Sequence, residues 1–187
     1  MLSEMSTVHM AAVSTTAHVT AHLILAKLAK SLERTRNLKS EQRDKLVINC
    51  VWLLLDTPLP AAYALAAHQL HQTLQSRWSA TNHLAKAAVA MHFGQNLYEL
   101  GLYLLSTKPG WDFLVHHTIV LLSFALVLGL DGEMSFWASL AGLVEISNIN
   151  LSLLKIMLIS EWGRGSTFEA VNGVLFWATF FVVRVVG

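Results

Sequence analysis

Long apolar runs alternate with short polar stretches along this chain. A hydrocarbon core about 30 Å thick is crossed by about 20 helical residues, so each such run is a candidate membrane span. We expect spans at residues 8–26, 46–66, 84–105, 113–130, 134–159 and 167–187. No internal repeat or low-complexity segment interrupts them. The pattern therefore predicts an all-α, multi-pass transmembrane helical bundle of about six spans, forming a single domain over residues 1–187.

The first two runs are the least regular. His18 and His22 dilute the apolar character of the first run, which leaves an amphipathic helix lying in the membrane interface as an alternative to a span. The second run contains Asp56, Pro58 and Pro60. Proline removes a backbone donor and clashes with the preceding turn, so we expect a kink or a break there. Neighbouring helices can satisfy the backbone groups that such a break frees.

Composition agrees with a membrane protein. The chain is 54% hydrophobic and 13% charged, whereas a soluble domain is about a quarter charged. The net charge is +1, and there is no Gly-rich phosphate loop or basic recognition helix, so we expect no nucleic-acid partner. The single cysteine, Cys50, excludes an internal disulfide and a CxxC metal site. No basic residue precedes the first apolar run, so we expect no cleaved secretory signal.

A basic linker joins the first two runs. Residues 27–45 read "KLAKSLERTRNLKSEQRDK" and hold more than half of the Lys and Arg residues of the chain. The positive-inside rule places this linker in the cytosol, which puts the N-terminus and the acidic turn at 131–133 on the other side. The linker either only sets this topology or also attracts anionic lipid headgroups or an acyl-CoA.

Ionisable side chains lie within the predicted spans, where a charge costs at least about 2.5 kcal/mol. They are Asp56, His92, Glu99, His116, His117, Glu145, Glu169 and Arg184. His92 and Glu99 are seven residues apart and share one helical face. With the cytosolic linker as reference, Glu99 and the His116–His117 pair fall at similar depth. We therefore expect a polar cluster between the third, fourth and fifth spans, open to the cytosol.

The adjacent histidines allow two interpretations. His116 and His117 point about 100° apart on a helix, yet both can border one cavity. An imidazole can pass protons near neutral pH or attack an acyl group. The alternative is that each is only an interhelical hydrogen-bond partner. His68 and His71 have metal-ligand spacing but no second histidine box, so we expect no metal site and no resident cofactor.

An ordered series of motifs runs through the second half of the chain. The motifs are "FGQNLYE" (93–99), "HHTIVLLSF" (116–124), "VEISNINLSLLK" (144–155), Asn172 and "FFVVR" (180–184). Over residues 84–187 this order resembles the TLC family (TRAM, Lag1 and CLN8 homology). The resemblance implies a helical bundle around a lipid-sized pocket in the endoplasmic reticulum or another secretory-pathway membrane.

In the ceramide synthase branch of that family, the His pair carries acyl transfer from acyl-CoA to a sphingoid base. Carried over, the resemblance makes His116 and His117 the catalytic pair. It implies these substrate-binding residues: His92, Glu99, Glu145, Asn148 and Arg184. Ceramide synthases carry an Asp-rich motif after the His pair, whereas this chain reads "LVEISN". The chain is therefore more similar to the TLC-domain-containing proteins than to true ceramide synthases.

The expected function is a role in lipid metabolism or membrane lipid homeostasis. Acyl transfer to a lipid amine or a lysolipid is one form of it, with acyl-CoA as co-substrate. A non-catalytic lipid-binding or lipid-sensing protein is the alternative, and a structural bundle or membrane-protein chaperone is a second. Membrane lipids are the expected partners, and a homodimer stays open. The chain ends three residues after Arg184, where the family's last helix normally continues, which favours a partial sequence.

Overall fold

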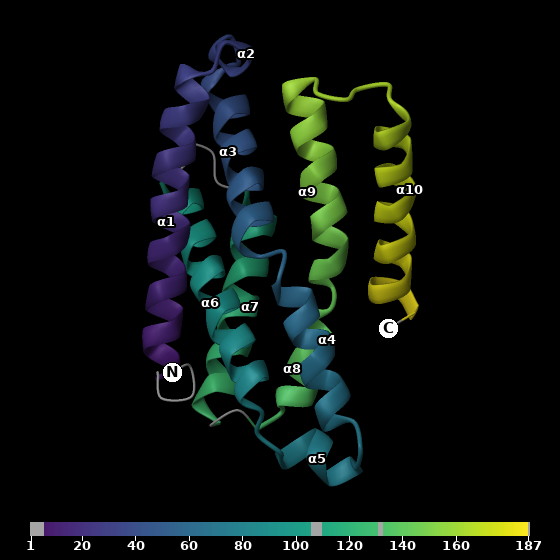
Figure 1. Cartoon of the computed structure of the whole chain (residues 1–187). Helices are drawn as coiled ribbons and strands as arrows, with labels where there is room; N and C mark the ends of the chain where they lie inside the picture. Colours follow the sequence, from purple (N-terminus) through teal and green to yellow (C-terminus); the bar gives the residue numbers. More distant parts are fainter. Residues whose placement is uncertain (1–5, 106–109, 131–132, 187) are drawn as a thin grey trace. The chain divides into compact units, whose positions relative to one another are not determined.

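The computed structural model describes residues 6–105, 110–130 and 133–186, and over these ranges it is helical without strands (Figure 1). The expected connections at 106–109 and 131–132 lie outside the described residues. The chain forms two compact units. The first contains α1 up to Val19 together with the segment Ala61–Gly142, and the second contains Thr20–Pro60 and the segment from Leu143 onward. Each unit is described by itself.

The helices follow one another along the chain, and the last passes into a π-helical turn. They are α1 (Thr7–Ser31), α2 (Glu33–Arg36), α3 (Ser40–Leu55), α4 (Leu59–Leu70), α5 (Leu74–Ser79), α6 (His83–Leu104), α7 (Trp111–Gly129), α8 (Ser135–Gly142), α9 (Glu145–Ser160), α10 (Thr167–Phe181) and the π-helical turn Val182–Val186. The short helix α5 was not expected. It begins at Thr73, whose hydroxyl accepts a hydrogen bond from the backbone N–H of Ser76 at 3.0 Å, a common way to start a helix.

The expected all-α membrane bundle is confirmed. Among the described residues, four helical stretches are long and apolar enough to cross a membrane: Ser40–Leu70, Trp111–Gly129, Ser135–Ser160 and Thr167–Val185. The expected spans 8–26 and 84–105 form α1 and α6, which do not belong to these four, and their crossing of the membrane stays a prediction. In α6, buried polar residues such as His92 and Gln95 lower the hydropathy. These side chains face the protein, so hydropathy alone understates how well this helix fits a bilayer.

The expected break in the second span is confirmed. α3 ends at Leu55 and α4 begins at Leu59, with Pro58 between them. The backbone N–H of Asp56 still donates to the carbonyl of Trp52, at 2.8 Å, so a hydrogen-bonded turn closes α3. The Asp56 side chain is only 1% exposed.

The fifth expected span, 134–159, corresponds to the apolar helical stretch Ser135–Ser160. It is two helices, α8 and α9, separated by Leu143 and Val144. No proline marks this break. α9 opens with Glu145 in its first turn, where a carboxylate is favoured by the partial positive charge of a helix N-terminus.

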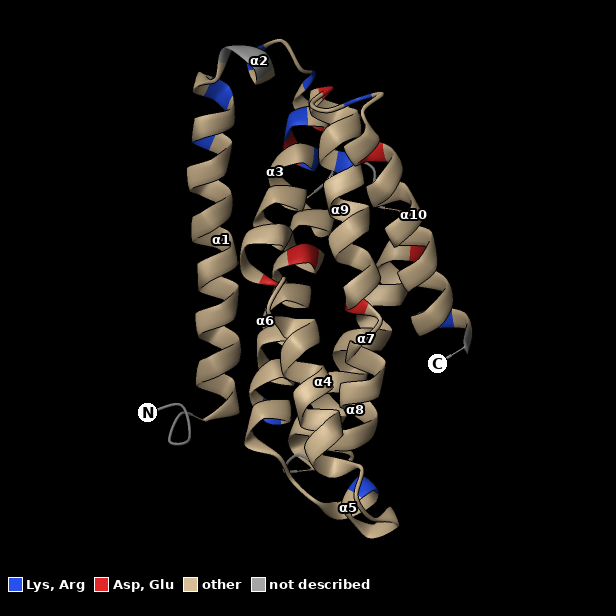
Figure 2. Ribbon diagram, turned by 45° about the vertical axis from the view of Figure 1, so that its right-hand side comes forward, with Lys and Arg blue, Asp and Glu red and all other residues tan. Residues whose placement is uncertain are grey.

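The basic linker at 27–45 is more helical than expected. α1 continues through Lys27 to Ser31, α2 follows, and α3 begins at Ser40. The guanidinium of Arg43 donates to the carbonyls of Arg36 and Leu38, both at 3.0 Å, which fastens the turn between α2 and α3. Lys and Arg residues gather at the end of α1, at α2 and at the start of α3 (Figure 2).

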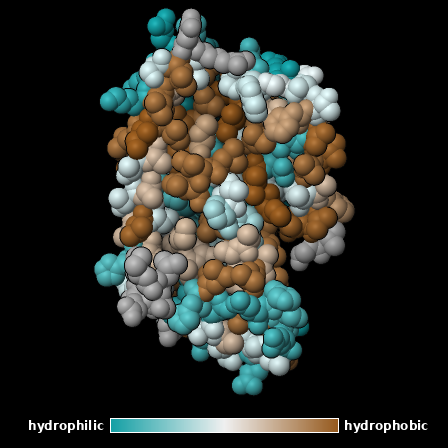
Figure 3. Space-filling model, in the orientation of Figure 1, coloured by the Kyte–Doolittle hydropathy of each residue, from teal (hydrophilic) through white to brown (hydrophobic). Residues whose placement is uncertain are grey.

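One face of α7 is apolar and exposed along the whole helix. The exposed residues recur at helical spacing and are Trp111, Val115, Ile119, Leu122 and Leu126. The side chains of His117, Leu121 and Phe124 are buried instead. Such a stripe on a 19-residue helix is what contact with acyl chains requires. On the face drawn in Figure 3, hydrophobic residues cover the middle, and hydrophilic residues lie toward the top and bottom of the view.

In the first unit, glycines let two pairs of helices come close. A Cβ at Gly94 would lie 2.4 Å from the carbonyl oxygen of Ala11, so α1 and α6 touch through backbone. The hydroxyl of Ser14 donates to the carbonyl of Met91 at 2.7 Å across the same contact. A Cβ at Gly142 would lie 2.4 Å from the ring of Tyr63, which is fully buried. Small residues and hydroxyl groups of this kind hold helices together in membranes.

Candidate functional site

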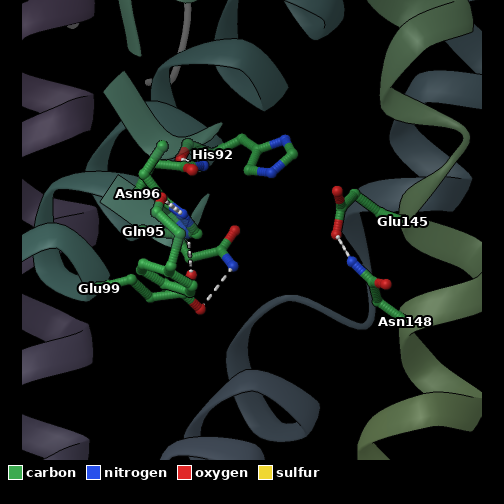
Figure 4. A network of polar contacts seen from close by, with 8 residues as sticks. His92, Gln95, Asn96, Glu99, Glu145 and Asn148 are labelled. Atoms are coloured by element: carbon green, nitrogen blue, oxygen red, sulfur yellow. Dashed lines mark hydrogen bonds and ion pairs between the residues drawn. The ribbon is translucent and has the colours of Figure 1, made fainter. Parts of the chain in front are cut away.

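α6 carries a stripe of buried polar side chains in the first unit. Asn82 caps the helix, accepting a hydrogen bond from the backbone N–H of Ala85 at 2.9 Å. Downstream, His92, Gln95 and Asn96 are each at most 5% exposed. These residues lie along one helix together with Glu99 (Figure 4). Their helical register is therefore what brings four polar side chains into the same part of the unit.

The side chain of His92 contacts two aromatic residues. Its Nδ1 lies 3.1 Å from the hydroxyl of Tyr63, and its ring centroid lies 4.8 Å from that of Phe124 on α7. Its backbone carbonyl accepts from the amide of Asn96 at 2.9 Å. The Gly142–Tyr63 contact and the Tyr63–His92 hydrogen bond therefore connect α8, α4 and α6.

The centre of the site is a buried pair formed by Glu99 and His117. The Nε2 of His117 lies 2.7 Å from Oε2 of Glu99, and the two side chains are 8% and 16% exposed. The Nδ1 of His117 lies 3.1 Å from the carbonyl of Phe113. A carbonyl can only accept, so Nδ1 carries a proton. One further proton lies between Nε2 and Glu99. The pair is thus net neutral whichever partner holds that proton.

Aromatic rings fix the orientation of His117. The ring of Phe113 is stacked between Tyr103 and His117, with centroid separations of 3.4 and 3.6 Å. Both ring nitrogens of His117 are engaged, Nδ1 by the carbonyl of Phe113 and Nε2 by Glu99.

The two adjacent histidines occupy different environments. His117 is buried, whereas His116 is exposed. The two rings meet edge to face with centroids 5.2 Å apart. The two rings are therefore close together, but only that of His117 is buried, and a cavity bordered by both stays a prediction. A helix turns by about 100° per residue, so burying one histidine turns its neighbour outward.

A second polar cluster lies in the second unit, around the start of α9. The amide nitrogen of Asn148 donates to Oε2 of Glu145 at 2.7 Å (Figure 4). Its amide oxygen accepts from Nη2 of Arg184 at 3.3 Å. The Nε of Arg184 also donates to the hydroxyl of Ser147, at 3.3 Å. Asn148 thus links a carboxylate on α9 to a guanidinium in the π-helical turn after α10.

We expect Arg184→Ala to loosen the end of α10 with a modest effect on stability, about 1 kcal/mol or less. The guanidinium is exposed, and besides its two hydrogen bonds it lies 5.5 Å from the Phe180 ring centroid. Protease cleavage within residues 182–186 measures the change, with Arg164→Ala as the control for loss of a surface charge. An unchanged cleavage rate in Arg184→Ala would contradict the role given to this cluster.

The seven residues expected at the site divide into two groups. The first unit holds His92, Glu99, His116 and His117, and the second holds Glu145, Asn148 and Arg184. Two contributors were not expected, Tyr63 and Phe113. Phe113 lies four residues before His117, so helical spacing was a usable signal for it. Tyr63 had no local signal, because only the packing of α4 brings it to His92.

Comparison with known proteins gives a family. The TLC domain model matches residues 46–187. A relative from Gallus gallus, "TLC domain-containing protein 1", is 26% identical over 113 residues. That alignment covers 59% of this chain and 44% of the relative, so the chain matches less than half of the length of that protein. No solved structure matches.

Proposed function

Because the chain belongs to the TLC-domain family, we propose that it acts in lipid metabolism or membrane lipid homeostasis by binding a lipid beside the Glu99–His117 pair. The four apolar helices and the family indicate an integral membrane protein. The proposal extends to a membrane of the secretory pathway, with the endoplasmic reticulum as the first candidate. In this function the protein binds or senses a lipid and is not required to transform it.

The observation that carries this proposal is the 2.7 Å contact between Glu99 and His117 in a buried part of a membrane protein. Ionisable groups at membrane depth are costly and are associated with function. Both ring nitrogens of His117 are engaged, by Glu99 and by the carbonyl of Phe113. The pair is therefore well suited to offering a fixed polar surface to a headgroup, and poorly suited to attacking an acyl carbon.

Acyl transfer is the second candidate, and it rests on His116. This imidazole is exposed and lies beside the buried pair. As general base, it would take the proton from an attacking amine or hydroxyl of a lipid. The new C–N or C–O bond would form as the C–S bond of an acyl-CoA breaks, and the same proton would pass to the leaving thiolate. His117 would then position the His116 ring and take no covalent part.

The lipid composition of cells expressing the protein separates the two candidates. We compare the native protein with His116→Ala and His117→Ala at equal abundance, and use His83→Ala, an exposed histidine at the start of α6, as the matched control. Lipid binding predicts that the change in composition is lost in His117→Ala and kept in His116→Ala. Acyl transfer predicts that His116→Ala lowers the rate of product formation by about 10²-fold or more.

His83→Ala must behave as the native protein does, because it touches neither member of the buried pair. If His116→Ala and His117→Ala both leave the change in composition intact, neither candidate function involves this site.

A further inference from the structure

One buried polar atom beside the pair has no partner. Gln95 is 3% exposed, and its amide nitrogen donates to Oε1 of Glu99 at 3.3 Å (Figure 4). Within the described ranges, no group donates to the other end of this amide, the oxygen Oε1. A buried acceptor without a donor is unfavourable, and most such atoms in proteins are satisfied.

The orientation of this amide follows from its neighbour. Reversing it would set the Gln95 oxygen against the oxygen of Glu99 that now accepts from the nitrogen. It would also leave the nitrogen as the unmatched atom. Each orientation therefore leaves one polar atom of Gln95 unsatisfied. The orientation in which nitrogen faces Glu99 leaves an acceptor, so the missing group is a hydrogen-bond donor.

The charge of the missing donor follows from the Glu99–His117 pair. That pair is net neutral, since a single proton lies between its members, and Gln95 is neutral too. An ammonium group brought to Gln95 would be a buried charge without a counter-ion among these three side chains, which is strongly unfavourable. A hydroxyl group has no such cost, and it donates one proton to one acceptor.

We propose that Gln95 Oε1 is the recognition point for a neutral, hydroxyl-bearing lipid, which donates its O–H to this oxygen beside the Glu99–His117 pair. The inference rests on the proposed lipid-binding function and gives it a substrate class. It makes Gln95 a specificity-determining residue, because the same lipid without its O–H leaves the oxygen unmatched. Discrimination of this kind comes from a buried polar group that an incorrect ligand cannot satisfy.

The test uses the full chain in nanodiscs with a photoreactive long-chain monoacylglycerol as probe. Three competitors share one alkyl chain: octadecanol, octadecyl methyl ether, which has no O–H, and octadecylamine, which is charged. For the native protein we expect octadecanol to compete roughly three- to ten-fold more strongly than the ether, the value of one hydrogen bond. We expect the amine to compete no better than the ether.

Variants at Gln95 and Gln72 test whether Gln95 determines the preference for octadecanol over the ether. Gln95→Met keeps the volume and removes the acceptor, so we expect the preference for octadecanol over the ether to disappear while the ether still competes. Gln72→Met, on the exposed turn before α5, is the matched control and keeps the preference. Retained competition by the ether also shows that Gln95→Met has folded.

The possible outcomes distinguish a failure of the role given to Gln95 from a failure of the proposed lipid-binding function. Equal competition by octadecanol and the ether in the native protein overturns the role of Gln95 and leaves lipid binding intact. A preference for octadecylamine overturns the neutrality argument. Absence of saturable labelling, with no competition by any of the three, overturns the proposed function together with the inference.

Discussion

His117→Ala is expected to lower the free energy of unfolding by about 3 kcal/mol. Removing one member of a buried ion pair leaves the other buried and unpaired, which typically costs 3–5 kcal/mol. We place this variant at the lower end of the range because the side chain of Glu99 remains 16% exposed. The thermal midpoint of the purified protein, followed by helical circular dichroism in detergent, measures the loss.

The double variant Glu99→Met/His117→Phe is the informative control. It removes both charged groups and fills their volume with apolar atoms, and such replacements are often neutral or stabilising. The amide of Gln95 loses its acceptor in this variant, which costs about 1 kcal/mol. We therefore expect the double variant to recover most of the stability lost in His117→Ala. A double variant as unstable as the single one would mean that the pair contributes shape rather than charge.

Gly94→Ala is the second large effect that we expect. The added Cβ would lie 2.4 Å from the backbone oxygen of Ala11 and 2.7 Å from Cβ of Ser14. A backbone oxygen cannot rotate away, so α1 must shift from α6, and two hydrogen bonds across the contact are strained. They join Ser14 to the carbonyl of Met91 and Thr15 to that of Gly94. Overpacking of this type costs about 1–3 kcal/mol.

Gly101→Ala on the same helix is the matched control for Gly94→Ala. Apart from its chain neighbours and the nearby backbone of its own helix, no described atom lies within 4 Å of a Cβ at Gly101. Alanine is also the better helix former by about 1 kcal/mol. The thermal midpoint should therefore fall for Gly94→Ala and stay level or rise for Gly101→Ala. Equal falls in both variants would contradict a close contact between α1 and α6.

The sequence alone predicted the long apolar helices and a polar cluster containing Glu99, His116 and His117, but not which histidine pairs with Glu99. Apolar runs of span length indicate helices wherever they occur, and Pro58 marks the break before α4. Helical register placed Glu99 on the face of His92 and near the depth of His116 and His117. It did not say which histidine turns inward, since the two residues are equivalent in an apolar run. Tertiary packing of α7 on α6 decides that.

The second break had weaker local signals. Gly142 and Glu145 flank the turn between α8 and α9, yet glycine inside an apolar run is common in membrane helices. Gly142 is required because the ring of Tyr63 packs against it and leaves no room for a Cβ. Tyr63 lies almost eighty positions earlier in the chain. For the same reason Tyr63 could not be assigned to the site in advance. Long-range packing supplies information that spacing along one helix does not contain.

The identity of the lipids that co-purify with the protein tests the central claim most directly. We compare the native chain, the Glu99→Met/His117→Phe variant, which we expect to fold, and the Gly101→Ala control, each extracted in the same detergent. If the Glu99–His117 pair binds a headgroup, mass spectrometry finds one lipid class enriched with the native chain and with Gly101→Ala, and not with the double variant. The same enriched class in all three proteins would contradict the account.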